Sequence, residues 1–171
     1  MLKKIFVITA ISFSLIFTEN LVNDNQSFNL SIGAFNERLG LNIANFSYTF
    51  YTKDNNEVFV SVGNIVLFLW TAGLGWKRYF KIKNKDKISP FVCSSILKRW
   101  GNKLAVTNGS SIREDNCINF ATGVSFHIAE IKTVDMNLYF QMGAFLSHDF
   151  RNETAQFGFI NLEFRFKKNH Y

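Results

Sequence analysis

Proline, cysteine and histidine are scarce in this sequence, which has one, two and three of them among 171 residues. The two cysteines, Cys93 and Cys117, are too few for a disulfide framework. The sequence contains neither a CxxC pair nor a cluster of histidine with cysteine, the patterns that indicate a zinc site. We therefore predict neither a metal site nor a cofactor. Beyond the N-terminus, no apolar run reaches the roughly 20 residues that a transmembrane helix needs.

Composition and charge exclude two further classes of protein. Apolar residues make up 47% of the chain and phenylalanine alone occurs 20 times, so the chain is too apolar to be disordered. The formal charge is +6, but the basic residues are scattered, with short clusters at 81–87 and 165–168. We interpret these clusters as turn and end residues, because no helix-turn-helix, zinc-finger or RNA-binding signature accompanies them. We therefore predict no nucleic-acid partner, and the length allows one domain.

The N-terminus has the pattern of an export signal. Two lysines precede an apolar run of 13 residues, Ile5–Phe17. Such a run is too short to span a bilayer as a stable helix, but it suits the core of a signal peptide. We therefore predict a signal peptide over residues 1–20, export of the protein, and a single domain over residues 21–171.

The last stretch of the chain, Phe157–Lys167, shows the clearest pattern. From Ile160 it alternates without exception, with Ile160, Leu162, Phe164 and Phe166 on one face and Asn161, Glu163, Arg165 and Lys167 on the other. A period of two indicates a β-strand, because successive side chains leave opposite faces of the pleat. This strand has one face of large apolar groups and one face that carries both signs of charge.

Seven earlier segments repeat this two-faced pattern, and helical periodicity is almost absent. With the last stretch, they are Ser27–Phe35, Leu39–Tyr51, Val58–Val66, Thr71–Lys81, Ile88–Trp100, Ile118–Ile128, Met136–Phe145 and Phe157–Lys167. The apolar phase slips at Ala44-Asn45, which is typical of a β-bulge, and the phase of Ile88–Trp100 is ambiguous. Compact turns at 53–56 and 83–87 alternate with longer loops at 101–116 and 147–154. These features predict an all-β fold, an antiparallel up-and-down β-barrel of about eight strands.

Alternation alone leaves open which face lies inside the barrel. A soluble, lipocalin-like carrier turns its apolar faces inward, whereas a membrane barrel turns them outward. Small and polar residues dominate the less apolar face of each segment, which suits the narrow lumen of eight strands. Aromatic residues gather near segment ends, as in interfacial girdles, at Tyr51, Trp70, Trp76, Trp100 and Phe145. We therefore predict outward apolar faces, with the compact turns on the periplasmic side and the 101–116 loop outside the cell.

Three stretches carry a resemblance to a known family: Gly73–Phe80, Gly123–Ile128, and the last strand with the terminal aromatic Tyr171. Through them the chain resembles the small eight-stranded outer-membrane β-barrels of Gram-negative bacteria. The resemblance implies an outer-membrane location, with outer-membrane lipid and the barrel-assembly machinery as partners. In that family, a C-terminal strand that ends in an aromatic residue acts as the assembly signal. The resemblance does not identify an extracellular ligand or partner.

Some barrels of this size remove acyl chains from lipid A, so polar residues near the C-terminus become candidate catalytic groups. The candidates are His127, Ser147, His148, Asp149 and Glu163. The pattern of those enzymes has a serine two positions after the histidine, whereas Phe150 stands in that position after His148. Ser147 and His148 are adjacent, and adjacent residues on a strand face opposite sides. We therefore predict a non-enzymatic barrel with a structural or surface-interaction role; a lipocalin-like carrier and a lipid A-modifying enzyme stay as alternatives.

The inward register also predicts a polar network in the lumen. It holds Lys77 on the fourth segment, His127 on the sixth, and both Glu163 and Arg165 on the eighth. Long side chains reach one another across such a narrow lumen, and buried charges persist only when they are paired. Glu163 is the only acid that we place in the middle of an inward register. We therefore expect Glu163 to be the hub, with Arg165, Lys77 or both as partners, in a lumen that is plugged by polar side chains.

The two cysteines are expected to lie apart on neighbouring strands. If Trp100 and Cys117 lie near opposite positions across the 101–116 loop, Cys93 pairs with about residue 124. The two sulfur atoms are then roughly 23 Å apart along the sheet. A disulfide needs Cα atoms within about 7 Å, so we predict that both thiols are free.

Overall fold

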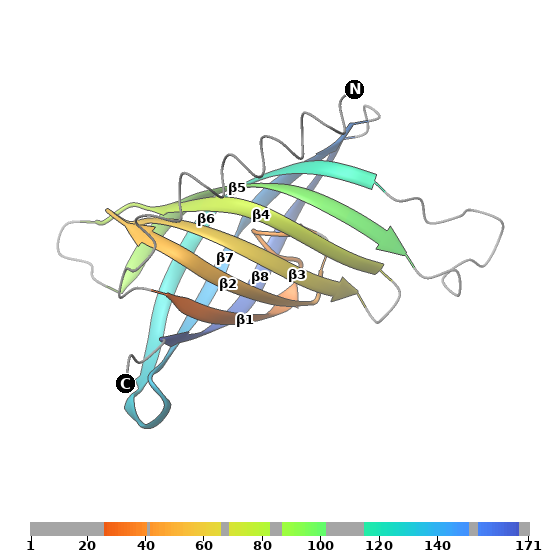
Figure 1. The fold of residues 1–171 in the computed structure, drawn as a ribbon. Coiled ribbons are helices and arrows are strands. Elements are labelled where there is room, and N and C mark those ends of the chain that lie inside the picture. Colours follow the sequence, from red (N-terminus) through yellow and green to blue (C-terminus); the bar gives the residue numbers. More distant parts are fainter. Residues whose placement is uncertain are drawn as a thin grey trace.

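The computed structural model describes residues 26–40, 42–65, 69–82, 87–101, 115–150 and 154–167 (Figure 1). The predicted signal peptide, most of the turn at 83–87, most of the 101–116 loop and the terminal Tyr171 lie outside these residues. Among the residues described, no helix is long and apolar enough to cross a membrane.

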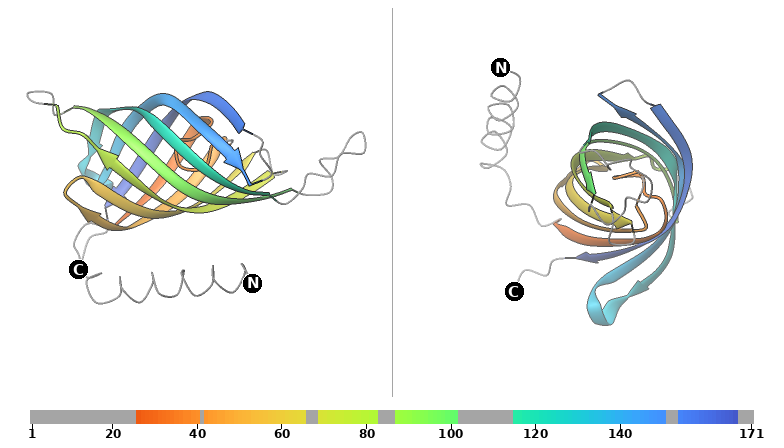
Figure 2. Two further views of the ribbon diagram at one scale, coloured as in Figure 1. Left: turned by 90° about the horizontal axis from the view of Figure 1, so that it is seen from above. Right: turned by 90° about the vertical axis from the view of Figure 1, so that its right-hand side faces the viewer.

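The described residues form eight strands that close into a barrel (Figures 1 and 2). The strands are β1 (Ser27–Ala34), β2 (Ala44–Lys53), β3 (Asn56–Ile65), β4 (Leu69–Tyr79), β5 (Ile88–Gly101), β6 (Asp115–Ile131), β7 (Met136–Asp149) and β8 (Thr154–Lys167). Each strand pairs antiparallel with its neighbours in sequence, and β8 closes the ring on β1. A short 3₁₀ helix, η2 (Lys132–Val134), joins β6 to β7. The predicted all-β, up-and-down barrel is therefore confirmed.

The two ends of the barrel differ in their connections. One end, which we call the short-turn end, carries the β2–β3 turn, η2, the start of β1 and the end of β8. Asp54 and Asn55 in the β2–β3 turn have φ values of 50° and 65°. Positive φ at both central residues is the geometry of the tight hairpin turns that match the twist of a sheet. The other end, the loop end, carries the connections that follow β1, β3, β5 and β7.

The alternation in β8 sets which side chains enter the lumen. Asn161 and Glu163 are 2% and 0% exposed, whereas the neighbouring Ile160 and Leu162 are 52% and 39% exposed. Cross-strand pairing extends each face around the barrel, because directly paired residues point the same way. Glu163, for example, lies opposite Ser31 on β1 and Tyr139 on β7. The predicted outward direction of the apolar faces is therefore confirmed.

The second predicted segment is wrong at its start. β2 begins at Ala44 rather than Leu39, and the chain between β1 and β2 folds into the barrel instead of extending the sheet (Figure 2). The phase slip at Ala44-Asn45 marks the point where the chain rejoins the wall. The irregularity that a β-bulge produces lies further on, between Thr49 and Tyr51 in the β2–β3 pairing.

Other strands are longer than predicted at the loop end. β7 continues to Asp149 and β8 begins at Thr154, so residues 147–149 belong to the wall and not to a charged loop. Trp70 likewise belongs to β4, where it lies opposite Trp100 on β5. These extensions place aromatic side chains at the loop end of neighbouring strands.

A layer of large apolar side chains lies inside the lumen, together with the polar groups. Phe59, Phe91, Phe145 and Phe159 come from β3, β5, β7 and β8, and each is at most 2% exposed. The expectation that Phe145 belongs to an interfacial girdle is therefore wrong, because its side chain points into the lumen. A glycine makes room for this layer, because a Cβ at Gly143 would lie 2.1 Å from a carbonyl oxygen of β6 and 2.9 Å from the Phe159 ring. The lumen is therefore packed with both charged and aromatic side chains.

Cys93 and Cys117 are both buried, and neither is in a disulfide. Cys93 lies opposite Ala121, and Cys117 lies opposite Leu97, so the β5–β6 register differs from the predicted pairing of Cys93 with about residue 124. Because Cys117 lies opposite Leu97, the two cysteines are separated along the hairpin by the four residues from Cys93 to Leu97, which is roughly 13 Å. That distance is too long for a disulfide.

We expect a thiol reagent to label both cysteines in the denatured, non-reduced protein and neither in the folded protein. The physical reason is that both side chains are enclosed in the lumen, where a reagent reaches them only on unfolding. Peptide mass spectrometry before and after denaturation measures both states. Recovery of a disulfide-linked pair of peptides would contradict the β5–β6 register.

Candidate functional site

The centre of the lumen is occupied by residues 36–40, the segment between β1 and β2 that we call the plug. Asn36 and Gly40 pair like strand residues, with N···O distances of 2.8 and 2.7 Å between their backbone groups. The side-chain oxygen of Asn36 accepts hydrogen bonds from the backbone N–H groups of Arg38 and Leu39, at 2.8 and 3.3 Å. Gly40 has a φ of 71°, which favours glycine. These local bonds form a tight loop that is narrow enough to enter the barrel.

The backbone of the plug is held by polar side chains of the wall. Asn119 on β6 donates a hydrogen bond of 2.8 Å to the carbonyl oxygen of Glu37. Ser95 on β5 donates to the carbonyl oxygen of Arg38. Because carbonyl groups without a partner are costly inside a protein, these two contacts fix the depth at which the plug lies.

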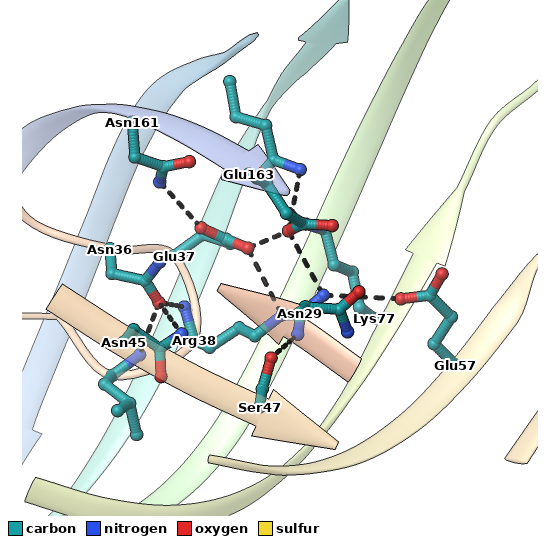
Figure 3. A network of polar contacts seen from close by, with 12 residues as sticks. Asn29, Asn36, Glu37, Arg38, Asn45, Ser47, Glu57, Lys77, Asn161 and Glu163 are labelled. Carbon is teal, nitrogen blue, oxygen red and sulfur yellow. Dashed lines mark hydrogen bonds and ion pairs between the residues drawn. The ribbon is translucent and has the colours of Figure 1, made fainter. Parts of the chain in front are cut away.

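Arg38 places a guanidinium group among acidic side chains of the wall. Its NH2 atom lies 3.3 Å from Glu163 Oε2 and 3.6 Å from Glu57 Oε2, and its NH1 atom donates to Ser47 Oγ (Figure 3). The side chain is fully buried, and its guanidinium carbon lies 4.8 Å from the centroid of the Phe59 ring. Arg38 is therefore held by β2, β3 and β8 at once.

Glu37 reaches a different part of the wall. Its Oε1 atom accepts a hydrogen bond of 2.8 Å from Lys77 Nζ on β4, and its Oε2 atom accepts one of 3.0 Å from Asn161 on β8. Lys77 Nζ also donates to Gln141 at 3.2 Å, and it lies 4.1 Å from the centroid of the Phe91 ring. Adjacent residues of the plug thus bind opposite charges on different strands.

Arg165 completes the network on the side of the short-turn end. Its NH1 atom lies 2.7 Å from Glu57 Oε1, and its NH2 atom lies 2.8 Å from both Glu163 Oε1 and Tyr79 Oη. Glu57 and Glu163 are therefore each shared between Arg165 of the wall and Arg38 of the plug. The carboxylates of Glu57 and Glu163 thus alternate with the guanidinium groups of Arg38 and Arg165 around a closed ring, which we call the charged ring.

Charge is balanced across this set of side chains. Arg38, Lys77 and Arg165 carry three positive charges, and Glu37, Glu57 and Glu163 carry three negative ones. Removing a charge from water costs several kcal/mol, and a partner restores that energy only when both groups are also hydrogen-bonded. Each cation here has at least one carboxylate within 3.3 Å, which explains why six ionised groups tolerate burial together.

Three of the four predicted lumen residues come together at this site. Lys77, Glu163 and Arg165 share contacts through Glu163, which also accepts a hydrogen bond of 3.1 Å from Gln141. His127 also faces the lumen but lies nearer the short-turn end, where its ring is 5.1 Å from the Tyr139 ring. The network also reaches Tyr139, because the guanidinium carbon of Arg165 lies 5.1 Å from the centroid of the Tyr139 ring.

Sequence reasoning missed the other half of the network. Glu57 is 3% exposed and enters the lumen from the start of β3, so a second acid of the wall joins Glu163 although it does not lie in the middle of its strand. Glu57 precedes the predicted start of its segment by one residue. It lies two positions before Phe59, so the alternation of the strand places both side chains on the same face. Extending this alternation by one residue would have predicted that Glu57 points inward. Glu37 and Arg38 were assigned to a connection between strands, and no periodic pattern indicates that a connection turns inward.

The candidate catalytic residues do not converge. Ser147 faces the lumen, where its Oγ atom accepts a hydrogen bond of 2.6 Å from Arg99. His148 is the next residue along β7, and its Nδ1 atom lies 2.8 Å from Thr154 Oγ1 on β8. Glu163 is bound within the charged network. Within the described residues, no three side chains of histidine, cysteine, aspartate or glutamate gather as metal ligands.

A cavity of about 810 Å³ lies inside the short-turn end of the barrel, and we call it the turn-side cavity. Its lining includes Lys53, Glu57, Lys81, Ser125, Tyr139 and Arg165. Glu57 and Arg165 also belong to the charged ring, so the ring forms the inner wall of the cavity. Arg38 belongs to both the ring and the plug, and the rest of the plug lies beyond that wall, on the side of the loop end.

The fold and the site define an eight-stranded antiparallel barrel with an apolar exterior and a lumen that is occupied by a charged plug. Strand number, order and closure match the predicted resemblance to the small outer-membrane barrels. No family model and no curated protein matches the chain. Among solved structures, the chain is similar to the Yersinia pestis outer membrane protein Ail in a phospholipid bilayer nanodisc, with 10% identity over 84% of this chain and 99% of that chain, and a TM-score of 0.45.

Proposed function

We propose that this protein is an outer-membrane β-barrel with a structural or surface-interaction role and no catalytic activity. The observation that carries the proposal is the exposed apolar surface, to which every strand contributes. Outward side chains that are 44–61% exposed include Phe28, Ile32, Phe46, Val60, Leu74, Ile96, Phe120, Met142 and Ile160. A continuous apolar surface of this kind is unfavourable in water and favourable in a lipid bilayer.

The backbone and the aromatic residues support the same location. A closed barrel pairs the backbone groups of every strand with a neighbour, which is the requirement for a β-structure that spans lipid. Trp70 and Trp100 lie side by side at the loop end, while Trp76 is nearer the short-turn end and donates a hydrogen bond of 3.2 Å to Asn56. Tryptophans near both ends of a barrel suit the two interfaces of a membrane.

The two alternatives fit this arrangement less well. A lipocalin-like carrier needs an apolar interior for its ligand, but the plug and four charged side chains of the wall occupy the centre of this lumen. A lipid A-modifying enzyme needs a nucleophile within hydrogen-bonding reach of its base. Ser147 and His148 face opposite sides of β7, so they do not form such a pair.

We expect the exported protein to fractionate with the outer membrane and to resist extraction by alkaline carbonate. On a detergent gel, we expect the unboiled protein to migrate differently from the boiled protein, because the closed barrel stays folded until it is heated. Release of the protein in the soluble periplasmic fraction would contradict the proposal.

Lipid A from expressing and non-expressing cells should have the same mass spectrum, and the loss of an acyl chain on expression would instead support the enzyme.

A further inference from the structure

The turn-side cavity has the size and the boundaries of a ligand site. Its volume of about 810 Å³ falls within the range of roughly 300–1,000 Å³ that small-molecule sites occupy. The charged ring closes it towards the plug, since Arg165 and Glu57 line the cavity and also contact Glu163 and Arg38. The β2–β3 turn and the adjoining ends of β4 and β5 form the rim.

Positive charge is in excess among the described residues that line this cavity. Lys53, Lys81 and Arg165 carry three positive charges, against two negative charges on Asp54 and Glu57. The charges of Glu57 and Arg165 are already matched within the ring. The two lysines are exposed at the rim, and among the described lining residues only Asp54 offsets them. Field lines are focused inside a walled cavity, so even this small excess favours the entry of an anion.

A buried hydroxyl group in the wall lacks a partner. Ser125 on β6 is 3% exposed, lines the cavity, and its Oγ atom has no hydrogen-bond partner within the described part of the chain. Ser89 lies opposite Ser125 on β5 and lines the same cavity. Buried polar groups are normally hydrogen-bonded, so this unsatisfied hydroxyl in the cavity lining is available to a bound polar molecule.

The mixture of groups suits a ligand with one anionic end and several hydroxyl groups. Lysine ammonium groups and an arginine are common partners of phosphate. Ser89 and Ser125 both donate and accept hydrogen bonds, while the carboxylate of Asp54 and the side-chain oxygen of Asn55 accept them from sugar-like hydroxyls. We propose that the turn-side cavity binds a small phosphorylated polyol, with the phosphate at Lys53 and Lys81 and the hydroxyl groups against Ser89 and Ser125.

The probe for this proposal is glycerol 3-phosphate, titrated by calorimetry into the folded protein in a zwitterionic detergent. We expect saturable binding with a dissociation constant on the order of 1 mM, and at least about tenfold weaker binding of uncharged glycerol. Binding should weaken as salt is added, because the two lysines are exposed and therefore screened. Equal affinity for glycerol and glycerol 3-phosphate, or no saturable binding of either, would overturn the proposal.

Matched variants locate the site. The double variant Lys53→Gln/Lys81→Gln should bind glycerol 3-phosphate at least about tenfold more weakly, and Ser125→Ala should bind it about threefold more weakly. Lys132→Gln removes an exposed charge from η2, at the same end of the barrel but outside the lining, and should bind like the parent. The unboiled gel migration shows that each variant is folded. If Lys132→Gln weakens binding as much as the double variant, the site is a diffuse surface charge and the proposal fails.

The phosphate can come from a free solute or from a phospholipid headgroup. The protein is therefore placed in nanodiscs of phosphatidylcholine alone or with phosphatidylglycerol, whose headgroup is a glycerol joined to an anionic phosphate diester. If phosphatidylglycerol blocks the binding of glycerol 3-phosphate, the cavity takes the headgroup. If the affinity is the same in both nanodiscs, the cavity takes the free solute. Both outcomes support the phosphate site, and loss of binding in both nanodiscs would overturn it.

Discussion

Replacing Glu163 with glutamine is expected to destabilise the barrel by about 3–5 kcal/mol, the usual cost of removing one partner of a buried ion pair. Glu163 is fully buried, and its two oxygen atoms contact Arg38, Arg165 and Gln141. Glutamine keeps the shape but removes the charge, so the three cations of the network are left with two carboxylates. The expected result is a clearly lower midpoint of unfolding in urea, measured in detergent.

The matched control for this experiment is Glu130→Gln. Glu130 is an exposed acid on β6, near η2, where solvent screens its charge. We expect this variant to change stability by less than about 1 kcal/mol, as exposed ion pairs usually do. A Glu163→Gln variant as stable as Glu130→Gln would show that water reaches the network and that its pairing contributes little to stability.

The wall of the barrel was predictable from the sequence because each strand has one apolar and one polar face. In β8, apolar residues alternate with polar ones, and the structure places Ile160, Leu162 and Phe166 on the exterior and Asn161 and Glu163 in the lumen, as this pattern predicts. The phase of β5 was ambiguous for a physical reason. Its inward residues include Phe91 and Leu97, which pack inside the lumen, so both faces of this strand carry large apolar groups.

The plug was not predictable by the same reasoning. Asn36-Glu37-Arg38 has the composition of a polar surface turn, and periodicity does not distinguish a turn that faces solvent from one that enters a lumen. What fixes the inward position is long-range: Lys77, Glu163 and Asn119 are far from the plug in sequence and bind it only in the closed barrel. The inward register did give indirect evidence that another acidic group enters the lumen. It holds two cations, Lys77 and Arg165, and these together need more than one carboxylate.

Charge balance also bears on how the plug can be removed. Arg38→Gln alone leaves three buried carboxylates with two cations, and we expect it to cost as much as Glu163→Gln. Removing Glu37 and Arg38 together leaves Lys77 and Arg165 with Glu57 and Glu163, two charges of each sign. The double change should therefore cost less than the sum of the two single changes, because the single changes are coupled through shared partners. A barrel without the charges of the plug should thus remain folded.

Replacing residues 37–39 with Gly-Ser-Gly is therefore expected to open the barrel to ions without unfolding it. In planar bilayers, the parent should show no steady single-channel steps, whereas the variant should show steady steps, because water and ions fill the space left by Glu37, Arg38 and Leu39. The control replaces residues 132–134 of η2 with the same three residues; these side chains are exposed and lie outside the lumen, so this variant should stay closed. Gel migration before boiling confirms that both variants are folded. A folded but closed 37–39 variant would instead assign closure to the layer of Phe59, Phe91, Phe145 and Phe159, which spans the lumen from four strands of the wall.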